Sequence, residues 1–134
     1  MEHNPELIDQ KNSREKLITY VDIFAQDDFT PYQKIKVEDG EFEVYSEEVD
    51  SFIQLFYKSK LLVNFRWQDW QKEALKFFEN PLLVNEALEE DVLKLLTLHI
   101  RKDRFFDGHL GEMIETKHIS QILQRLKNLS NQAK

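Results

Sequence analysis

The chain has 134 residues, contains no cysteine and carries a formal net charge of −7 at pH 7. This length suits one domain with one hydrophobic core, and the lack of cysteine excludes disulfides, zinc–thiolate sites and a thiol nucleophile. The acidic balance disfavours non-specific binding to DNA. The sequence has neither a signal-peptide pattern nor an apolar run long enough to cross a bilayer, so we expect a cytoplasmic location and no membrane contact.

The elements expected along the chain are mostly helices. With three glycines and three prolines, the sequence favours long helices over a β fold with many turns. We expect a frayed polar segment over residues 1–12 and a single helical domain over residues 13–130, in which Ser13 caps a first helix from Arg14 to about Gln26. Apolar positions with the helical period predict later helices from Ser46, across residues 67–78, from about residue 89 to 106, near residues 110–114 and over residues 119–129. The predicted fold is mainly α, a single-domain bundle of about five to six helices.

The segment YQKIKVEDGEFEVY departs from this helical pattern. Apolar and polar residues alternate in its first half and again in its second half, and alternation of this kind indicates strands. Asp39 and Gly40 lie between the two runs, and glycine accepts the positive φ that tight turns need. We therefore predict a small β-hairpin near residues 33–45; the alternative is an extended loop.

Two tryptophans, Trp67 and Trp70, lie three residues apart on one face of the predicted third helix. A pair with this spacing most often belongs to the core, and we expect it there. Because tryptophan rarely buries all of its surface and its indole N–H seeks a partner, an edge of the pair is also a candidate for lining a groove or a dimer contact.

Charged residues gather around the end of the predicted fourth helix, in residues 100–109. His99 and Asp103 are four residues apart on its apolar side, so their side chains could meet. Because an unpaired carboxylate on an apolar face is costly, we predict structural ion pairs around Asp103. Its candidate partners are His99, Arg104 and Arg125. The alternative is an acid–base pair in which Asp103 orients His99; no nucleophile stands at a recognised spacing, so we assign no catalytic residue.

Asp107 and Gly108 have a structural interpretation as well. Gly108 can take the left-handed conformation that closes the predicted fourth helix, and Asp107 can accept amide hydrogen bonds at the start of the next one. The competing hypothesis is a metal site built from Asp103, Asp107, His99 and His109, but their spacing matches no known signature. We therefore expect no metal and no cofactor.

The C-terminal part of the chain is more basic than the rest. Residues 99–134 hold seven basic and four acidic groups, and guanidinium groups suit carboxylate or phosphate ligands. The candidate binding or structural motif consists of Trp67, Trp70, Arg101, Arg104, Asp107 and His109. Nucleic acid is a less favoured partner, because its binding needs a broader basic face with exposed aromatics, and we expect Phe105 and Phe106 in the core.

The segments WQDW, LLTLHIRKDRFFDGHLGEMIE and ISQILQRL resemble an uncharacterised bacterial family of helical domains, domain of unknown function 6508. In the family pattern a Trp-x-x-Trp segment precedes an Arg-x-x-Arg-Phe-x-Asp/Glu-Gly signature, and a glycine stands where this chain has Lys117 and His118. Over about residues 45–129, the matching positions are Trp67, Trp70, Thr97, Arg101, Arg104, Phe105, Asp107, Gly108, Ile122, Leu123 and Leu126. The resemblance implies a fold and a shared pocket or surface, and it implies no activity.

Three functions follow from these observations. The favoured hypothesis is a non-enzymatic interaction module that binds another protein or a second copy of itself, because the surface is acidic, no nucleophile is recognised and the last helix is amphipathic. One alternative is a small anionic-ligand binder or an enzyme, with its pocket near the Arg-Phe-x-Asp-Gly corner. The other is a weak nucleic-acid binder that uses the basic C-terminal end.

Overall fold

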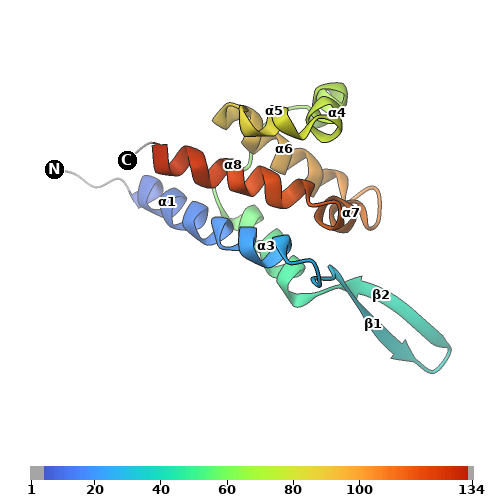
Figure 1. Cartoon of the computed structure of the whole chain (residues 1–134). Helices are drawn as coiled ribbons and strands as arrows, with labels where there is room; N and C mark the ends of the chain where they lie inside the picture. The colour runs from blue at the N-terminus through green and yellow to red at the C-terminus, as the bar shows by residue number, and fades with distance from the viewer. Residues whose placement is uncertain (1–4, 133–134) are drawn as a thin grey trace.

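The computed structural model describes residues 5–132, with side chains from residue 11 onward, and it confirms a mainly α fold with a small hairpin (Figure 1). The elements in chain order are α1 (Pro5–Ile18), α2 (Tyr20–Ala25), β1 (Tyr32–Val37), β2 (Gly40–Tyr45), α3 (Glu47–Lys58), the 3-10 turn η1 (Trp67–Trp70), α4 (Gln71–Glu79), α5 (Pro81–Asn85), α6 (Glu89–Lys102), α7 (His109–Glu115) and α8 (His118–Gln132). No helix within residues 5–132 is long and apolar enough to span a membrane.

The N-terminal helical region differs from the prediction. The first helix begins at Pro5 and not at Ser13, because proline suits the first turn of a helix. Residues 5–12, expected to be frayed, belong to α1, whereas residues 1–4 lie outside the described part of the chain. The predicted single helix is also divided at Thr19, whose hydroxyl and backbone N–H both donate to the Lys16 carbonyl, at 2.6 and 3.2 Å.

The core gathers around α8, which crosses the helical body with α1 and α3 on one side and α4 to α6 on the other (Figure 1). Its apolar stripe is buried as predicted, with Leu129 at the edge and only half-buried. Each fully buried aliphatic or aromatic side chain stabilises the fold by about 2 kcal/mol. The main contributors from α3, α6 and α8 are Val49, Phe52, Phe56, Val92, Leu95, Leu96, Ile119, Ile122, Leu123 and Leu126.

Side-chain caps fix two helix starts. Ser46 accepts a hydrogen bond from the Val49 N–H at 3.4 Å, which confirms the predicted start of α3. Asn80 accepts one from the Leu82 N–H at 3.2 Å, and Pro81 occupies the first turn. The Asn80–Pro81 pair therefore ends α4, as predicted, and also begins the short α5, which we did not predict.

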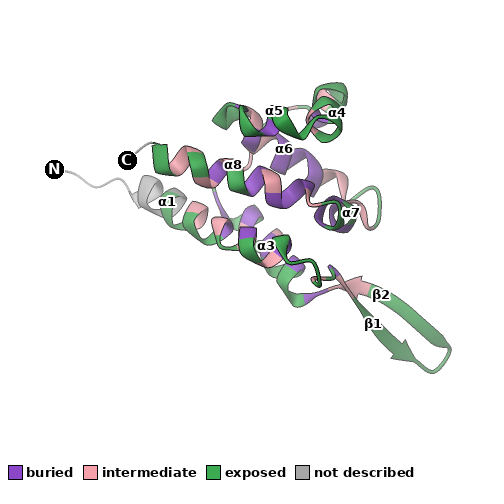
Figure 2. Cartoon of the chain, viewed as in Figure 1, coloured by how far each residue is buried: buried purple, intermediate pink, exposed green. Residues whose placement is uncertain are grey.

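The hairpin is confirmed and projects from one end of the helical body (Figure 1). Its strands pair antiparallel, with Ile35 opposite Phe42, and a two-residue loop, Glu38–Asp39, joins them. Gly40 follows the loop with a φ of +145°, a conformation that glycine adopts without strain. Residues 33–43 are all exposed, as the colouring of Figure 2 shows, so only the base of the hairpin contacts the body.

The segment between α6 and α7 is the second departure from the prediction. α6 ends at Lys102 and not near residue 106, and a series of turns connects it to α7. Phe105 and Phe106 lie in these turns and are 69% and 57% exposed, so the expectation that they fill the core was wrong. Gly108 adopts the predicted left-handed conformation, with a φ of +84°, but it precedes α7 and does not close α6.

Lys117 occupies the junction between α7 and α8 with a φ of +69°, in the left-handed region that favours glycine. Its side chain donates hydrogen bonds to the carbonyls of Phe24, at 3.1 Å, and Gln26, at 2.8 Å. A cation at the last carbonyls of a helix is favourable, so Lys117 caps the C-terminal end of α2. These contacts offset the strain of the left-handed backbone at Lys117.

Candidate functional site

Two tyrosines at the base of the hairpin anchor it to the helical body. Tyr32 and Tyr45 face each other across the strands, and their rings stack with centroids 5.6 Å apart. The Tyr45 hydroxyl donates to Asp103 Oδ1 and accepts from the Gly111 N–H at 3.1 Å. The Tyr32 hydroxyl donates to the Gly108 carbonyl at 3.2 Å. We call Tyr32, Tyr45, Asp103, Gly108 and Gly111 the tyrosine anchor.

Asp103 also accepts a hydrogen bond from the Leu110 N–H, at 2.9 Å, in the first turn of α7. Its carboxylate therefore satisfies a backbone donor that the helix leaves open. The sequence predicts this role for Asp107, which is exposed instead. The reason is the turn that follows α6: it directs Asp103 back toward α7 and β2.

Gly111 is required by the close approach of Tyr32 to α7. A Cβ atom at this position would lie 2.4 Å from the Tyr32 hydroxyl oxygen and 2.6 Å from Cζ. Heavy atoms do not approach so closely without a clash. The absence of a side chain thus lets the Tyr32 ring rest against the helix backbone.

Both tyrosines of the anchor stay protonated. The pKa of Tyr45 is raised far above its ordinary value of 10.0, first by burial and then by its hydrogen bond to Asp103. Burial and the nearby carboxylate of Glu115 raise the pKa of Tyr32. Neutral phenols of this kind donate hydrogen bonds and are poor bases or nucleophiles, so the anchor is suited to holding elements together.

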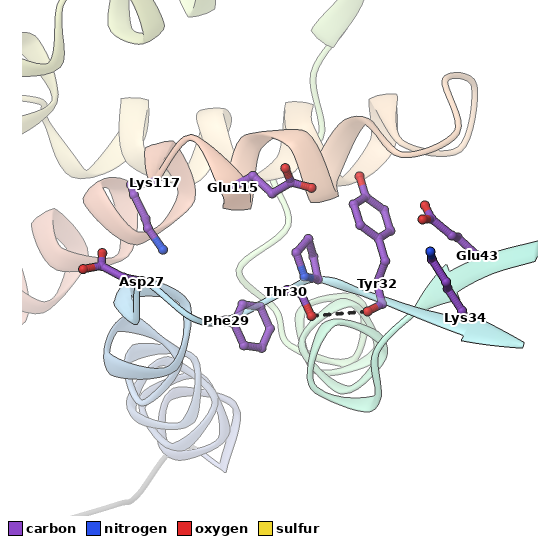
Figure 3. Close-up of a pocket in the computed structure, with 9 residues that line it drawn as sticks. Asp27, Phe29, Thr30, Tyr32, Lys34, Glu43, Glu115 and Lys117 are labelled. Carbon is purple, nitrogen blue, oxygen red and sulfur yellow. Dashed lines mark hydrogen bonds between the residues drawn. The ribbon is translucent and has the colours of Figure 1, made fainter.

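A cavity of about 490 Å³ lies beside the anchor, where the α2–β1 connection, the hairpin base and α7 meet (Figure 3). Tyr32 points from β1 toward Glu115 of α7, while Lys34 and Glu43 lie on the hairpin side. Lys117 lines the opposite end and is already bonded to the α2 carbonyls. The groups around this cavity carry both signs of charge and therefore indicate no particular class of ligand.

The six residues of the candidate motif have different surroundings. Trp67 is buried and packs against Phe105, with ring centroids 5.9 Å apart. Trp70 is half-buried between Phe65 and Phe77, with Lys94 Nζ 5.7 Å from its ring. The tryptophans thus lie in or beside the core, as predicted.

The charged members of the motif differ in exposure and in the cavities that they line. Arg101 is half-buried, and Arg104 is exposed. Asp107 lines a cavity of about 590 Å³ next to the tyrosine anchor. His109 lines a different cavity, of about 270 Å³, between α4, α6 and α7. Their use as a ligand site stays a prediction.

The predicted ion pairs around Asp103 are replaced by other contacts. Asp103 keeps helical backbone angles at the end of α6, but its carboxylate bonds to Tyr45 and Leu110, and the His99 ring packs against His109 and His118. Arg125 Nε donates to the Ala87 carbonyl at 2.9 Å. Within residues 5–132, no ion pair links Asp103 to His99, Arg104 or Arg125.

His99 belongs to a group of three imidazoles, in which His99 and His118 are buried and His109 is half-buried. His99 Nδ1 lies 3.0 Å from His109 Nε2, and the His99 and His118 rings meet edge to face with centroids 5.0 Å apart. Burial lowers the pKa of His99 well below 6.5 and lowers that of His118 to about 4, with neighbouring imidazoles adding to both effects. These rings are therefore neutral at pH 7. Sequence reasoning missed the group because α6, α7 and α8 each supply one member.

In the described chain no three histidine or carboxylate side chains are arranged to hold a metal ion. The competing metal site does not assemble there: Asp103 is bonded to Tyr45 and Leu110, and Asp107 is exposed.

The outer part of the hairpin exposes an apolar face. Ile35, Val37 and Phe42 are 38%, 51% and 48% exposed. They share one face, because residues that pair directly across strands point to the same side. The opposite face pairs Lys34 with Glu43 and Lys36 with Glu41. The sequence predicts this alternation. Alternation alone does not tell whether other residues of the chain bury the apolar face or leave it exposed to solvent.

Comparison of the chain with curated proteins and with solved structures found no match. A family model described as a family of unknown function, DUF6508, matches residues 10–132. This match spans nearly all of the residues that the structure describes, including the tyrosine anchor and the hairpin. The chain belongs to the DUF6508 family.

Proposed function

We propose that the protein is a non-enzymatic interaction module and that the outer hairpin, residues 33–44, is its contact surface. The observation that carries this proposal is the apolar face of Ile35, Val37 and Phe42, which stays open to solvent on an arm that projects from the body (Figure 2). Scattered exposed apolar residues are ordinary, whereas several on one face of one element mark an interaction site.

Hairpin stability supports the same conclusion. A two-stranded hairpin without a further strand or packed helix is marginal in water, and residues 33–43 have no such cover. A partner that buries the apolar face would add about 2 kcal/mol for each large side chain that becomes fully buried. Binding and ordering of the arm would therefore reinforce each other.

The anchor suits this use because it fixes the base of the arm. Tyr32 and Tyr45 tie both strands to the start of α7, so the hairpin is held at a defined angle to the body. Because the base is fixed, binding has to order only the outer part of the arm, which costs less conformational entropy than ordering a loop that is free at its base.

The alternative functions have less support. An acid–base pair needs Asp103 next to His99, but His99 contacts His109 and His118. Within the basic C-terminal end, Lys117 is bonded to backbone carbonyls, and Lys102 Nζ lies 5.6 Å from the Phe106 ring centroid.

Site-specific photo-crosslinking in cells tests the proposal. A photoreactive amino acid at position 42 should form a crosslinked adduct with a protein or with another copy of the chain. The matched control is the same substitution at Phe105, a more exposed phenylalanine (69%) away from the hairpin, where we expect no comparable adduct. A chain with position 42 substituted that stays free of adducts, although it is folded, would overturn the proposal.

A further inference from the structure

We infer that the partner of the hairpin is a second copy of this chain, which adds its β1 strand to the outer edge of β2. This inference rests on the proposed function and names the occupant of the contact surface. Three features of the hairpin carry it: two open strand edges, a separation of charge between the strands, and an apolar face that continues across the new contact.

Both strands have an open edge. Ser46 N donates to the Pro31 carbonyl at 2.8 Å, just beyond the last ladder pair. Since bonded and non-bonded pairs alternate in an antiparallel ladder, the pairs Lys34–Glu43 and Lys36–Glu41 are non-bonded. The backbone N–H and C=O groups of these four residues therefore point outward, two on each edge, and are available to a further strand.

The two strands carry opposite charges. The outward positions of β1 are Lys34 and Lys36, and those of β2 are Glu41 and Glu43. Lysines on an edge strand discourage most pairings, but the acidic edge of β2 complements them. A β1 strand from a second copy would set lysine opposite glutamate, as β1 does within the hairpin itself.

Charge also selects against the symmetric arrangements. Pairing β1 with β1 would oppose lysines, and pairing β2 with β2 would oppose glutamates; like charges directly opposite each other are destabilising. Pairing β1 with β2 aligns Ile35 of one copy with Phe42 of the other on the uncharged face. The four charged side chains stay on the far face, so the apolar surface becomes continuous.

This contact is heterologous, because each copy uses a different edge. Each bound copy leaves one edge free, so association can continue beyond two chains. The net charge of −7 per chain opposes large assemblies. We therefore expect oligomers whose mean mass rises with concentration.

Multi-angle light scattering of the purified full chain, over a range of concentrations, tests the inference. For the unchanged chain the mean mass should rise about twofold or more over that of one chain. Glu43→Pro removes an outward N–H but no bond inside the hairpin, and this variant should stay monomeric. Glu43→Gln keeps the N–H and loses only the charge, so it should associate more weakly than the unchanged chain but more strongly than Glu43→Pro.

A charge exchange between the two strands distinguishes loss of association from unfolding of the hairpin. Glu41→Lys with Glu43→Lys should abolish association. Adding Lys34→Glu and Lys36→Glu to the same chain restores opposite charges both within the hairpin and between copies, and should restore the mass. Circular dichroism checks that the helices remain in each variant.

A monomer at every concentration, or unchanged mass in Glu43→Pro, would overturn the inference. The crosslink at position 42 separates this failure from that of the proposed function. An adduct with a different protein would overturn the second-copy inference and leave the interaction module in place. Absence of any adduct would overturn both.

Discussion

The Tyr45 hydroxyl donates a hydrogen bond to the Asp103 carboxylate, although the two residues lie 58 positions apart in the chain. This bond connects the last residue of β2 to the turn that precedes α7. Because Asp103 also caps α7 through Leu110, a single carboxylate sets both the start of that helix and the position of the hairpin. The angle of the arm is therefore coupled to the α6–α7 corner.

Removing the Tyr45 hydroxyl should destabilise the fold. Tyr45→Phe deletes the donor to Asp103 and the acceptor for the Gly111 N–H, and we expect a loss of about 1–2 kcal/mol in the free energy of unfolding. Chemical denaturation measures it. Tyr57→Phe, at an exposed tyrosine of α3, is the matched control and should change stability little. Equal effects of the two substitutions would show that the anchor bond adds nothing.

Because Gly111 and Tyr32 are in close contact, Gly111→Ala should destabilise the unchanged chain but stabilise a chain that lacks the Tyr32 ring. In the unchanged chain, Gly111→Ala places a Cβ atom 2.4 Å from the Tyr32 hydroxyl oxygen and should cost about 1–3 kcal/mol of stability. In a Tyr32→Ala background the obstacle is gone. Alanine then has the better helix propensity by about 1 kcal/mol, so the same substitution should stabilise.

Denaturation of the four proteins in this double-mutant cycle measures the coupling. If Gly111→Ala had the same effect with and without the Tyr32 ring, the ring would not be what requires glycine at this position.

The backbone and the side chain of Lys117 should have opposite effects on stability: its left-handed backbone destabilises the fold, and its side-chain hydrogen bonds stabilise it. Lys117→Met keeps the strained φ of +69° and loses the bonds to the α2 carbonyls, so we expect a cost of about 2–3 kcal/mol. Lys117→Gly loses the same bonds but relieves about 1–2 kcal/mol of strain. Thermal unfolding should therefore rank the unchanged chain first, Lys117→Gly second and Lys117→Met last. If Lys117→Met were as stable as the unchanged chain, the hydrogen bonds that cap α2 would not contribute to stability.

The parts of the fold that could be predicted depend on local pattern. The α8 stripe, the Ser46 cap and the hairpin are readable because the period, the cap and the turn lie within a few residues of one another. The tyrosine anchor is not readable, because Tyr32 and Tyr45 look like ordinary strand residues until the fold brings them to Asp103. The same limit explains the missed imidazole group, in which three helices each supply one ring.

The error over His99 and Asp103 has a specific cause. The expected contact requires the two side chains to turn toward each other, and the backbone would allow it, since Asp103 has helical angles and its N–H donates to the His99 carbonyl at 3.2 Å. The pair does not form because Asp103 bonds to Tyr45 and His99 packs against His109 and His118, and these partners come from distant segments that the local pattern does not reveal. The exposed positions of Phe105 and Phe106 have another cause: both residues lie in the turns that follow α6 and not on its apolar stripe.

The buried imidazoles predict that the fold loses stability on acidification. An unfolded chain protonates His118 near pH 6.5, whereas burial and the neighbouring His109 delay protonation in the folded chain to a pKa of about 4. Between these values the unfolded state binds the extra proton, so acid favours unfolding. The loss from His118 alone should approach 3 kcal/mol, at about 1.4 kcal/mol per pH unit.

Denaturation midpoints between pH 7 and pH 4 measure this dependence. His118→Gln removes the titrating group, so its stability should fall less steeply over that range than that of the unchanged chain. The remaining slope should come in part from His99, whose pKa is also lowered by burial, and from the half-buried His109. Identical pH profiles for His118→Gln and the unchanged chain would mean that His118 has the same pKa in the folded and unfolded states. Burial of its ring against His99 and Phe78 would then not oppose its protonation.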